Sequence, residues 1–273
     1  MKADGHIHTP FCPHGTKDSF EKYIKRAIQL GYREISFTEH APLPRNFVDP
    51  TPDKDSGMDI NRLGEYFADL SFLKKKYASE LKINIGLEVD FIIDFEKETK
   101  SFLDEYGQFL DDSILSVHFL KKDQTYYCMD YSPDVFQEMI VAFSSVEAVY
   151  EAYYDTLLHS LAADLGVYKP KRIGHITLVH KFQKKFPPTY RFESKVGQVL
   201  DRIAKQGYSL DYNGAGINKP LCREPYPPSS VVKEAIKRKI PLVYGSDSHS
   251  SKDLHQGHDF LYPEANLVSP TQS

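Results

Sequence analysis

Short runs rich in β-branched and aromatic residues alternate along the chain with longer stretches in which apolar residues recur at helical intervals. The short runs predict seven strands, over residues 4–8, 34–38, 82–89, 113–118, 172–176, 208–212 and 241–245. The longer stretches predict helices over residues 18–30, 61–79, 95–109, 133–165, 193–206 and 229–239. This alternation favours a parallel sheet, and seven such units favour a closed α/β barrel over an open doubly wound sheet.

The first predicted helix shows the helical spacing clearly. Its apolar residues recur every three or four positions and share one face: Phe20, Tyr23, Ile24, Ala27 and Ile28. We expect Asp18 to cap the start of this helix and Gly31 to follow its end.

Two proline-rich segments, residues 41–60 and 213–230, interrupt the alternation and predict long loops. Loops that follow strands in a barrel lie at the C-terminal face of the sheet, where active sites are found. No repeat, low-complexity tract or linker separates a second unit, so we expect residues 1–273 to form a single domain.

Composition and charge narrow the function classes. The 273 residues are 41% hydrophobic and 26% charged, which is enough apolar material for a large core. Thirty-four Lys and Arg residues against 38 Asp and Glu residues give a net charge of −4, which disfavours a nucleic-acid binder. The chain has no long apolar run and begins with polar residues, so we expect a soluble, cytoplasmic protein without membrane contact.

The three cysteines, Cys12, Cys128 and Cys222, are far apart and contain no C-x-x-C pair. They therefore suggest neither a disulfide framework nor a thiolate metal site. Any metal in this chain is expected to bind through imidazole and carboxylate groups.

Histidines gather where the predicted strands end. Of the 11 histidines, seven lie at or just beyond a predicted strand end: His6, His8, His14, His40, His118, His175 and His249. Two carboxylates, Glu88 and Asp247, share this position, and an acid at the end of an apolar strand is costly to bury unless it is paired or metal-bound. Because strand ends converge on one face of a barrel, we expect these side chains to meet.

This set of groups predicts a multinuclear metal site. Imidazole and carboxylate ligands without thiolate suit Zn²⁺, Fe²⁺ or Mn²⁺. Nine ligands are too many for one ion but fit two or three, with Glu88 as the expected bridging carboxylate. Such sites usually hydrolyse phosphate esters. Of the other histidines, we expect His159 on a helix face and His255 and His258 in a solvated tail, and we leave His180 unassigned.

Seven segments together resemble the polymerase and histidinol phosphatase (PHP) family: Asp4-Gly5-His6-Ile7-His8-Thr9, Cys12-Pro13-His14-Gly15, Thr38-Glu39-His40, Gly86-Leu87-Glu88-Val89-Asp90, Ser116-Val117-His118, Ile173-Gly174-His175 and Gly245-Ser246-Asp247-Ser248-His249. The resemblance spans residues 4–249 and includes all nine metal-ligand positions of the family. It implies a distorted (β/α)7 barrel, similar to a TIM barrel, that holds two or three divalent ions of zinc, iron or manganese.

Within the family, the loop after His40, the insertion before His175 and the segment from Leu210 to Pro227 are similar to the histidinol-phosphate phosphatase members. This similarity implies hydrolysis of L-histidinol phosphate, a small phosphate ester, to L-histidinol and phosphate in histidine biosynthesis. The implied ligand sets are His6, His8, Glu88 and Asp247 for one metal, His14, His40 and His175 for a second, and Glu88, His118 and His249 for a third.

The resemblance also implies catalytic roles around this centre. A metal-bound hydroxide would be the nucleophile, and Asp247 and His40 would be catalytic residues, with Asp247 or a bound water protonating the leaving alkoxide. The chain departs from the family pattern after Asn213, where it has Ile217-Asn218-Lys219 in place of an expected arginine. The substrate phosphate would then be held by Lys219, Arg223 or Lys181.

Two other functions compete with this interpretation. One is a PHP-family phosphoesterase that acts on nucleotides or nucleic-acid ends, which the negative net charge disfavours for polymers. The other is a metal-binding module without catalysis, which has no need for open coordination positions on several ions.

Overall fold

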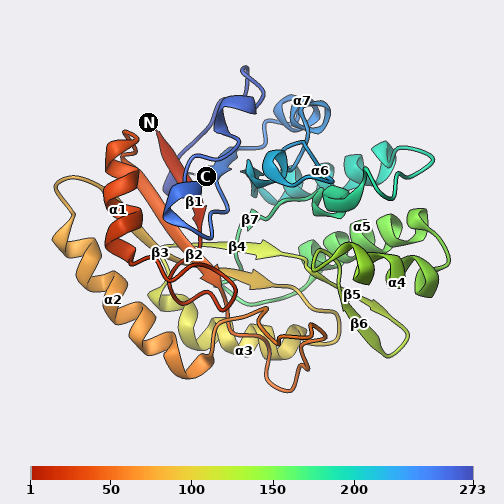
Figure 1. Ribbon diagram of the computed structural model, residues 1–273, viewed down its shortest axis with the longest axis horizontal. Helices are drawn as coiled ribbons and strands as arrows, with labels where there is room; N and C mark the ends of the chain where they lie inside the picture. The colour runs from red at the N-terminus through yellow and green to blue at the C-terminus, as the bar shows by residue number, and fades with distance from the viewer. Residues whose placement is uncertain (1, 273) are drawn as a thin grey trace.

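Seven parallel strands form the centre of the computed structural model, which describes residues 2–272 (Figure 1). Neighbouring strands follow the order β1 (Ala3–Ile7), β2 (Glu34–His40), β3 (Lys82–Asp90), β4 (Asp112–Ser116), β7 (Arg172–Ile173), β8 (Ser209–Asn213) and β9 (Leu242–Gly245). The seven predicted strands are therefore all confirmed. The strands are buried along nearly their whole length, which is typical of parallel strands that are covered on both faces.

The first and last strands of this sheet lie side by side. Ile7, the last residue of β1, forms a parallel bridge with Ser248, and the His8 N–H donates to the Ser248 carbonyl at 3.1 Å. The Asp247 N–H donates to the His6 carbonyl at 2.7 Å. The sheet thus curls round almost completely, which confirms the expected distorted (β/α)7 barrel.

Helices cover the outside of the barrel. They are α1 (Phe20–Gln29), α2 (Leu63–Lys76), α3 (Glu96–Tyr106), α4 (Pro133–Phe143), α5 (Val146–Ala162), α6 (Glu193–Gln206) and α7 (Ser229–Lys237). Figure 1 shows α1, α2 and α3 outside the first strands and α4 and α5 on the far side of the sheet. Helix α1 buries the predicted residues Phe20, Tyr23, Ile24 and Ala27.

The predicted cap of α1 was wrong. The residue before the helix is Ser19, and its side chain makes no capping hydrogen bond. Asp18 instead accepts hydrogen bonds from the backbone N–H and hydroxyl of Ser251, at 3.0 and 2.7 Å. Its carboxylate therefore ties the start of α1 to the segment that follows His249. Gly31 follows the helix at φ 79°, as predicted for a residue that ends a helix.

The helix predicted over residues 133–165 is two helices. Ser144 adopts a left-handed conformation, with φ 78°, and ends α4. Ser145 then caps α5, because its hydroxyl accepts a hydrogen bond from the Ala148 N–H at 3.0 Å. The apolar spacing continues across this break, so periodicity alone did not reveal it.

We expect Ser145→Ala to lower the free energy of unfolding by about 1 kcal/mol, because the Ala148 N–H loses its acceptor. Urea denaturation of the metal-loaded protein measures this loss. The matched control is Ser101→Ala, on an exposed position of α3, which should change stability by no more than about 0.5 kcal/mol. Equal losses in the two variants would contradict the capping role.

A hairpin that was not predicted follows β4. Strands β5 (Phe119–Lys122) and β6 (Thr125–Cys128) pair antiparallel outside the barrel sheet. Phe119 and Cys128 pack with Ile92 in a small apolar cluster separate from the main core, and Phe47 of the 41–60 loop packs against it. The hairpin and this loop together form one wall above the strand ends.

A buried ion pair lies at the opposite, N-terminal end of the strands. Arg172 begins β7, is 2% exposed, and donates from Nη2 to Asp112 Oδ2 at 2.6 Å and to the Gly5 carbonyl at 2.7 Å. A Cβ atom at Gly5 would collide with the guanidinium group, so glycine is required there by the close approach of the arginine.

Candidate metal centre

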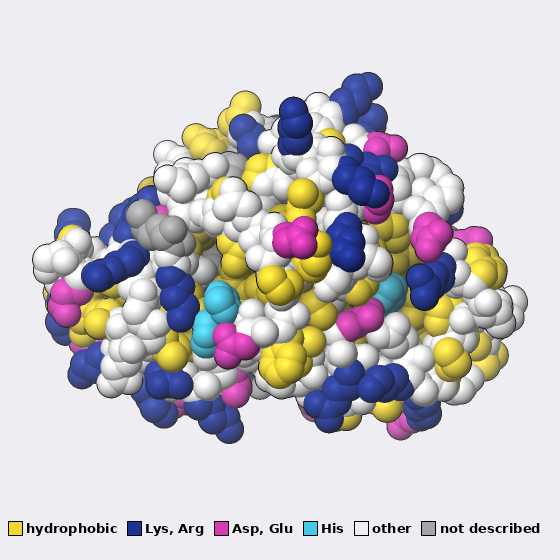
Figure 2. Space-filling view, turned by 90° about the horizontal axis from the view of Figure 1, so that it is seen from above, with side chains coloured by type: hydrophobic (Ala, Val, Ile, Leu, Met, Phe, Trp, Pro, Cys, Tyr) yellow, Lys and Arg dark blue, Asp and Glu magenta, His cyan; other side chains and the backbone are white. Residues whose placement is uncertain are grey.

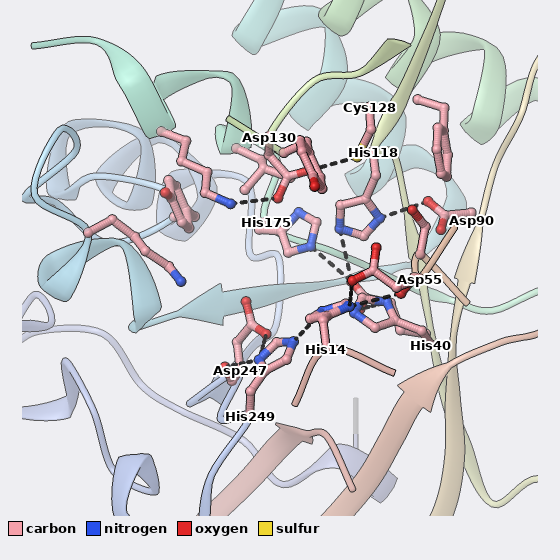
Figure 3. Close-up of a pocket in the computed structure, with 18 residues that line it drawn as sticks. His14, His40, Asp55, Asp90, His118, Cys128, Asp130, His175, Asp247 and His249 are labelled. Atoms are coloured by element: carbon pink, nitrogen blue, oxygen red, sulfur yellow. Dashed lines mark hydrogen bonds and ion pairs between the residues drawn. The ribbon is translucent and has the colours of Figure 1, made fainter. Parts of the chain in front are cut away.

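A cavity of about 400 Å³ opens at the carboxyl ends of the barrel strands. Seven of the nine predicted ligands line it, and the remaining two, His6 and His8, lie in contact with Glu88 and Asp247 beneath them. Figure 3 shows His14, His40, His118, His175, Asp247 and His249 turned toward one another. All nine predicted ligands therefore meet in one small volume, as expected from their positions at strand ends.

Glu88 lies in the middle of this volume and is 1% exposed. Its carboxylate oxygens approach five imidazoles: His6 Nε2 at 3.3 Å, His8 Nε2 at 3.6 Å, His40 Nδ1 at 3.2 Å, His118 Nε2 at 3.7 Å and His175 Nε2 at 2.9 Å. Burial raises the pKa of Glu88, but the charges of His6 and His118 outweigh burial and hold it well below its usual value. Glu88 is thus an ionised carboxylate among five imidazoles, and this position would allow it to bridge two cations.

The ligand atoms form three groups, one of which includes Glu88. The first is His6, His8 and Asp247, in which Asp247 Oδ1 lies 3.1 Å from His8 Nε2 and 3.8 Å from His6 Nε2. The second is Glu88, His118 and His175.

The third group lies nearer the surface. His14 Nε2 lies 3.1 Å from His249 Nε2, and the His14 and His40 rings are 5.1 Å apart. Burial lowers the pKa of His40 well below its usual value, and the neighbouring His8 lowers it further. The same two causes, burial and then His8, lower the pKa of His249. The His40 and His249 rings are therefore neutral and offer lone pairs to a cation.

This arrangement differs from the ligand sets implied by the resemblance. His175 lies beside His118 and Glu88, with its ring 4.9 Å from that of His118, whereas the resemblance implied His14 and His40 as its companions. His249 lies beside His14 and His40, whereas the resemblance implied that it would lie with Glu88 and His118. The two histidines exchange places because β7 lies next to β4, while the β9 loop returns beside β1.

Three carboxylates that the sequence interpretation did not single out orient the imidazoles. Asp211 Oδ2 lies 2.9 Å from His6 Nδ1, Glu39 Oε1 lies 3.1 Å from His8 Nδ1, and Asp90 Oδ1 lies 2.8 Å from His118 Nδ1. Each acceptor favours a proton on Nδ1, which leaves Nε2 free to bind a metal. Their signal in the sequence was an acid at a buried strand position, as with Glu88.

Several buried nitrogens in this cluster have no hydrogen-bond partner. Among the described side chains these include His6 Nε2, His40 Nδ1 and Nε2, and His175 Nδ1. Leaving a buried polar atom unpaired costs about 1–3 kcal/mol, so such atoms call for an explanation. Divalent cations in this cluster would give His6 Nε2 and one nitrogen of His40 a partner and would balance the charges of Glu88 and Asp247, so the residues fit the metals expected from their chemistry.

Cys12 is a neighbour of the cluster that was not expected. It is buried, and its sulfur lies within ligand range of His8, His40 and His249. Burial raises the pKa of the Cys12 thiol, so the sulfur remains protonated. The absence of disulfides was predicted and holds for the described residues, since all three cysteines are free.

The three candidate phosphate-binding cations occupy different places. Lys181 lines the cavity and forms an ion pair with Asp130 at 2.8 Å, and Lys219 lines the cavity from its exposed rim. Burial lowers the pKa of Lys181, but Asp130 outweighs it, so the net shift is upward and the amine is charged. Arg223 is exposed, lies outside this cavity and donates to the Ile217 carbonyl at 3.4 Å.

The four remaining histidines lie outside the cluster. His159 is exposed on α5, as expected. His180 pairs with Glu224 at 2.7 Å. His255 and His258 do not form a solvated tail, because their rings pack against Tyr32 and Tyr244.

The chain is similar to proteins of known family. The PHP domain model matches residues 4–215. The chain is 50% identical over 261 residues to the histidinol-phosphatase of Bacillus subtilis, which covers 95% of this chain and 97% of that protein. It is 26% identical over 263 residues to the histidinol-phosphatase of Lactococcus lactis, which covers 92% of this chain and 85% of that protein.

Solved structures agree with the barrel. The crystal structure of a HisK protein from Listeria monocytogenes superposes with a TM-score of 0.92 at 40% identity and covers 96% of this chain and 100% of that chain. Histidinol phosphate phosphatase from Lactococcus lactis, solved in complex with zinc, L-histidinol and phosphate, superposes with a TM-score of 0.70 at 21% identity. The superposition covers 98% of this chain and 95% of that chain, and it supports the barrel fold. Within residues 2–272, no helix is both long and apolar enough to cross a membrane. The match over most of the chain, together with these relatives, shows that the chain belongs to the PHP family.

Proposed function

We propose that this protein is a metal-dependent phosphomonoesterase that hydrolyses L-histidinol phosphate to L-histidinol and phosphate, as a step of histidine biosynthesis. The observation that carries the proposal is the 50% identity with the Bacillus subtilis histidinol-phosphatase along 95% of this chain. The cluster of nine metal ligands beside a small cavity supports it independently. We assign residues 1–273 to one PHP-type phosphatase domain.

We assign the ligands to as many as three divalent ions of zinc, iron or manganese. His6, His8, Glu88 and Asp247 would hold one, Glu88, His118 and His175 a second, and His14, His40 and His249 a third. Bound there, such ions supply a water of lowered pKa and positive charge for the phosphoryl oxygens. His40 is assigned here as a ligand, because its ring is neutral and both of its nitrogens lack partners.

Asp247 is the residue we assign to proton transfer. It lines the cavity, and its Oδ2 accepts a hydrogen bond from Asn213 Nδ2 at 3.1 Å. Burial raises the pKa of Asp247, but His6 and His8 outweigh burial and lower it well below its usual value. The group is therefore a carboxylate before the reaction. It can take the proton released by the attacking water and return it to the leaving alkoxide, so the proton balance closes within one turnover.

Lys181 is the cation we assign to the substrate phosphate, with Lys219 at the rim. We expect Lys181→Met to lower kcat/KM by about 10- to 150-fold, because a hydrogen bond to a charged group contributes about 1.5–3 kcal/mol. Arg223→Met is the matched control and should stay within about twofold, since that side chain lies outside the cavity. Steady-state phosphate release measures both. If both variants lose kcat/KM equally, or if only Arg223→Met loses it, the phosphate is not bound by Lys181.

Release of phosphate from L-histidinol phosphate by the metal-loaded protein tests the proposed reaction. Treatment with a strong chelator should abolish the activity, and added Zn²⁺ or Mn²⁺ should restore it. Nucleoside monophosphates and a short 3′-phosphorylated oligonucleotide serve as competing substrates. If the protein cleaves these and leaves L-histidinol phosphate intact, the nucleotide-directed alternative is correct and the proposal is wrong.

The surface shown in Figure 2 does not favour a phosphoesterase that acts on nucleic-acid ends. On the face shown in Figure 2, Lys and Arg side chains are scattered among acidic, apolar and uncharged groups and form no continuous basic surface. A cytoplasmic location is part of the proposal and accords with three cysteines that are all unpaired.

A further inference from the structure

A second cluster of metal-binding groups lies away from the catalytic cavity. His255, His258 and Asp259 each offer a ligand atom, and these atoms all lie within 4.8 Å of one another. They belong to the segment after β9, around the short helix η6 (His258–Phe260). None of the three lines the cavity that holds the proposed catalytic metals.

The distances in this cluster match those of a metal site. Asp259 Oδ1 lies 3.5 Å from His255 Nε2 and 3.4 Å from His258 Nδ1. Ligands at about 2.0–2.1 Å from a tetrahedral zinc ion are separated by about 3.3 Å, so a cation fits between these atoms with little movement. The two imidazole rings are tilted by 32° with centroids 4.2 Å apart, and each offers a ligand atom within 4.8 Å of the other.

Neighbouring tyrosines hold the rings in place. The Tyr32 hydroxyl lies 2.7 Å from His255 Nδ1, and Tyr32 itself is 1% exposed. When His255 Nδ1 carries the proton and donates it to the Tyr32 oxygen, Nε2 presents its lone pair toward Asp259. Metal-binding histidines are usually oriented by such a partner on the other nitrogen. The edge of Tyr244 packs on His258, with centroids 5.0 Å apart.

The charges around the cluster leave it open to a cation. The described cations that act on His255 are Lys2 and Arg26. The Lys2 amine donates a hydrogen bond to the Leu30 carbonyl at 2.9 Å and lies over the Tyr32 ring. Asp259 has 82% of its side chain exposed, which leaves room for water in the remaining coordination positions.

We propose that His255, His258 and Asp259 bind one divalent transition-metal ion, with zinc as the expected occupant, separately from the catalytic centre. Two imidazoles and one carboxylate are ligands that zinc accepts readily, and the absence of a thiolate excludes a purely soft-metal site. All three ligands come from a five-residue segment that contacts the turn between α1 and β2 through Tyr32. The ion stabilises the packing of the C-terminal segment on the barrel and takes no part in hydrolysis.

Zinc binding by the whole, catalytically loaded protein tests this site. Wild-type protein is dialysed against micromolar zinc, and bound zinc per chain is measured by elemental analysis. We expect His255→Gln and Asp259→Asn to hold one zinc ion fewer than wild type while kcat stays within about twofold. Tyr32→Phe should keep the site but weaken its zinc affinity by about 10- to 100-fold, because the orienting hydrogen bond is lost.

His159→Gln is the matched control, since it removes an exposed imidazole from α5, far from the cluster in sequence, and should bind as much zinc as wild type. Asp259→Asn guards against misfolding, because it changes only an exposed side chain. The same zinc content in wild type, His255→Gln and Asp259→Asn would overturn the proposal. So would an equal loss in His159→Gln.

Discussion

Replacing Glu88 with glutamine is expected to lower kcat for L-histidinol phosphate by about 10³-fold or more. The Glu88 carboxylate approaches five imidazoles, from 2.9 Å for His175 to 3.7 Å for His118. An uncharged amide cannot bridge two cations, and metals contribute several kcal/mol of transition-state stabilisation, at about 1.4 kcal/mol for each tenfold in rate. Bound metal, measured by elemental analysis, should fall together with kcat.

The control for this variant is Glu80→Gln, an exposed carboxylate before β3. It should leave both kcat and metal content unchanged. If Glu88→Gln keeps full metal content and loses less than about tenfold in kcat, the central role of this carboxylate is wrong. If it loses metal but not activity, the reaction does not depend on the cluster.

Replacing Arg172 with methionine is expected to cost about 3–5 kcal/mol of unfolding free energy. The guanidinium group is the partner of Asp112 at 2.6 Å, and both side chains are almost fully buried. Removing the arginine leaves an uncompensated carboxylate in the interior. Burial already raises the pKa of Asp112, and Arg172 is the main influence that lowers it again.

Urea denaturation at a fixed zinc concentration measures the loss. Arg238→Met is the matched control, because Arg238 pairs with Asp201 and Glu234 near the surface and should lose no more than about 1 kcal/mol. The double variant Arg172→Met with Asp112→Asn should recover part of the stability, since the buried charge is then gone. A loss below about 1 kcal/mol in Arg172→Met would show that the pair contributes little.

The strand ends were the part of this molecule that the sequence predicted best. Apolar runs identified every barrel strand, and the side chains just beyond them, such as His40 and His118, met as expected because parallel strands end on one face. Which imidazoles lie beside one another was not predictable in the same way. His175 lies beside His118 because their strands are neighbours in the sheet. The local spacing of apolar residues does not determine the order of strands.

The missed features depend on contacts between segments that are distant along the chain. Asp18 pairs with Lys22 of its own helix but also binds Ser251, and the β5–β6 hairpin is stabilised by Phe47 from another loop. The break at Ser144 depends on one left-handed residue inside an uninterrupted apolar pattern. Local spacing carries no information about such partners.

The contact between β1 and the segment after β9 has a consequence for the newly made protein. His6 and His8 leave the ribosome before the rest of the barrel, but Asp247 and His249 follow only after nearly all of its strands have been synthesised. Unfinished or truncated chains therefore lack part of every proposed ligand set except Glu88, His118 and His175. Such chains cannot bind the full set of ions, so complete loading with metal requires a chain that reaches His249.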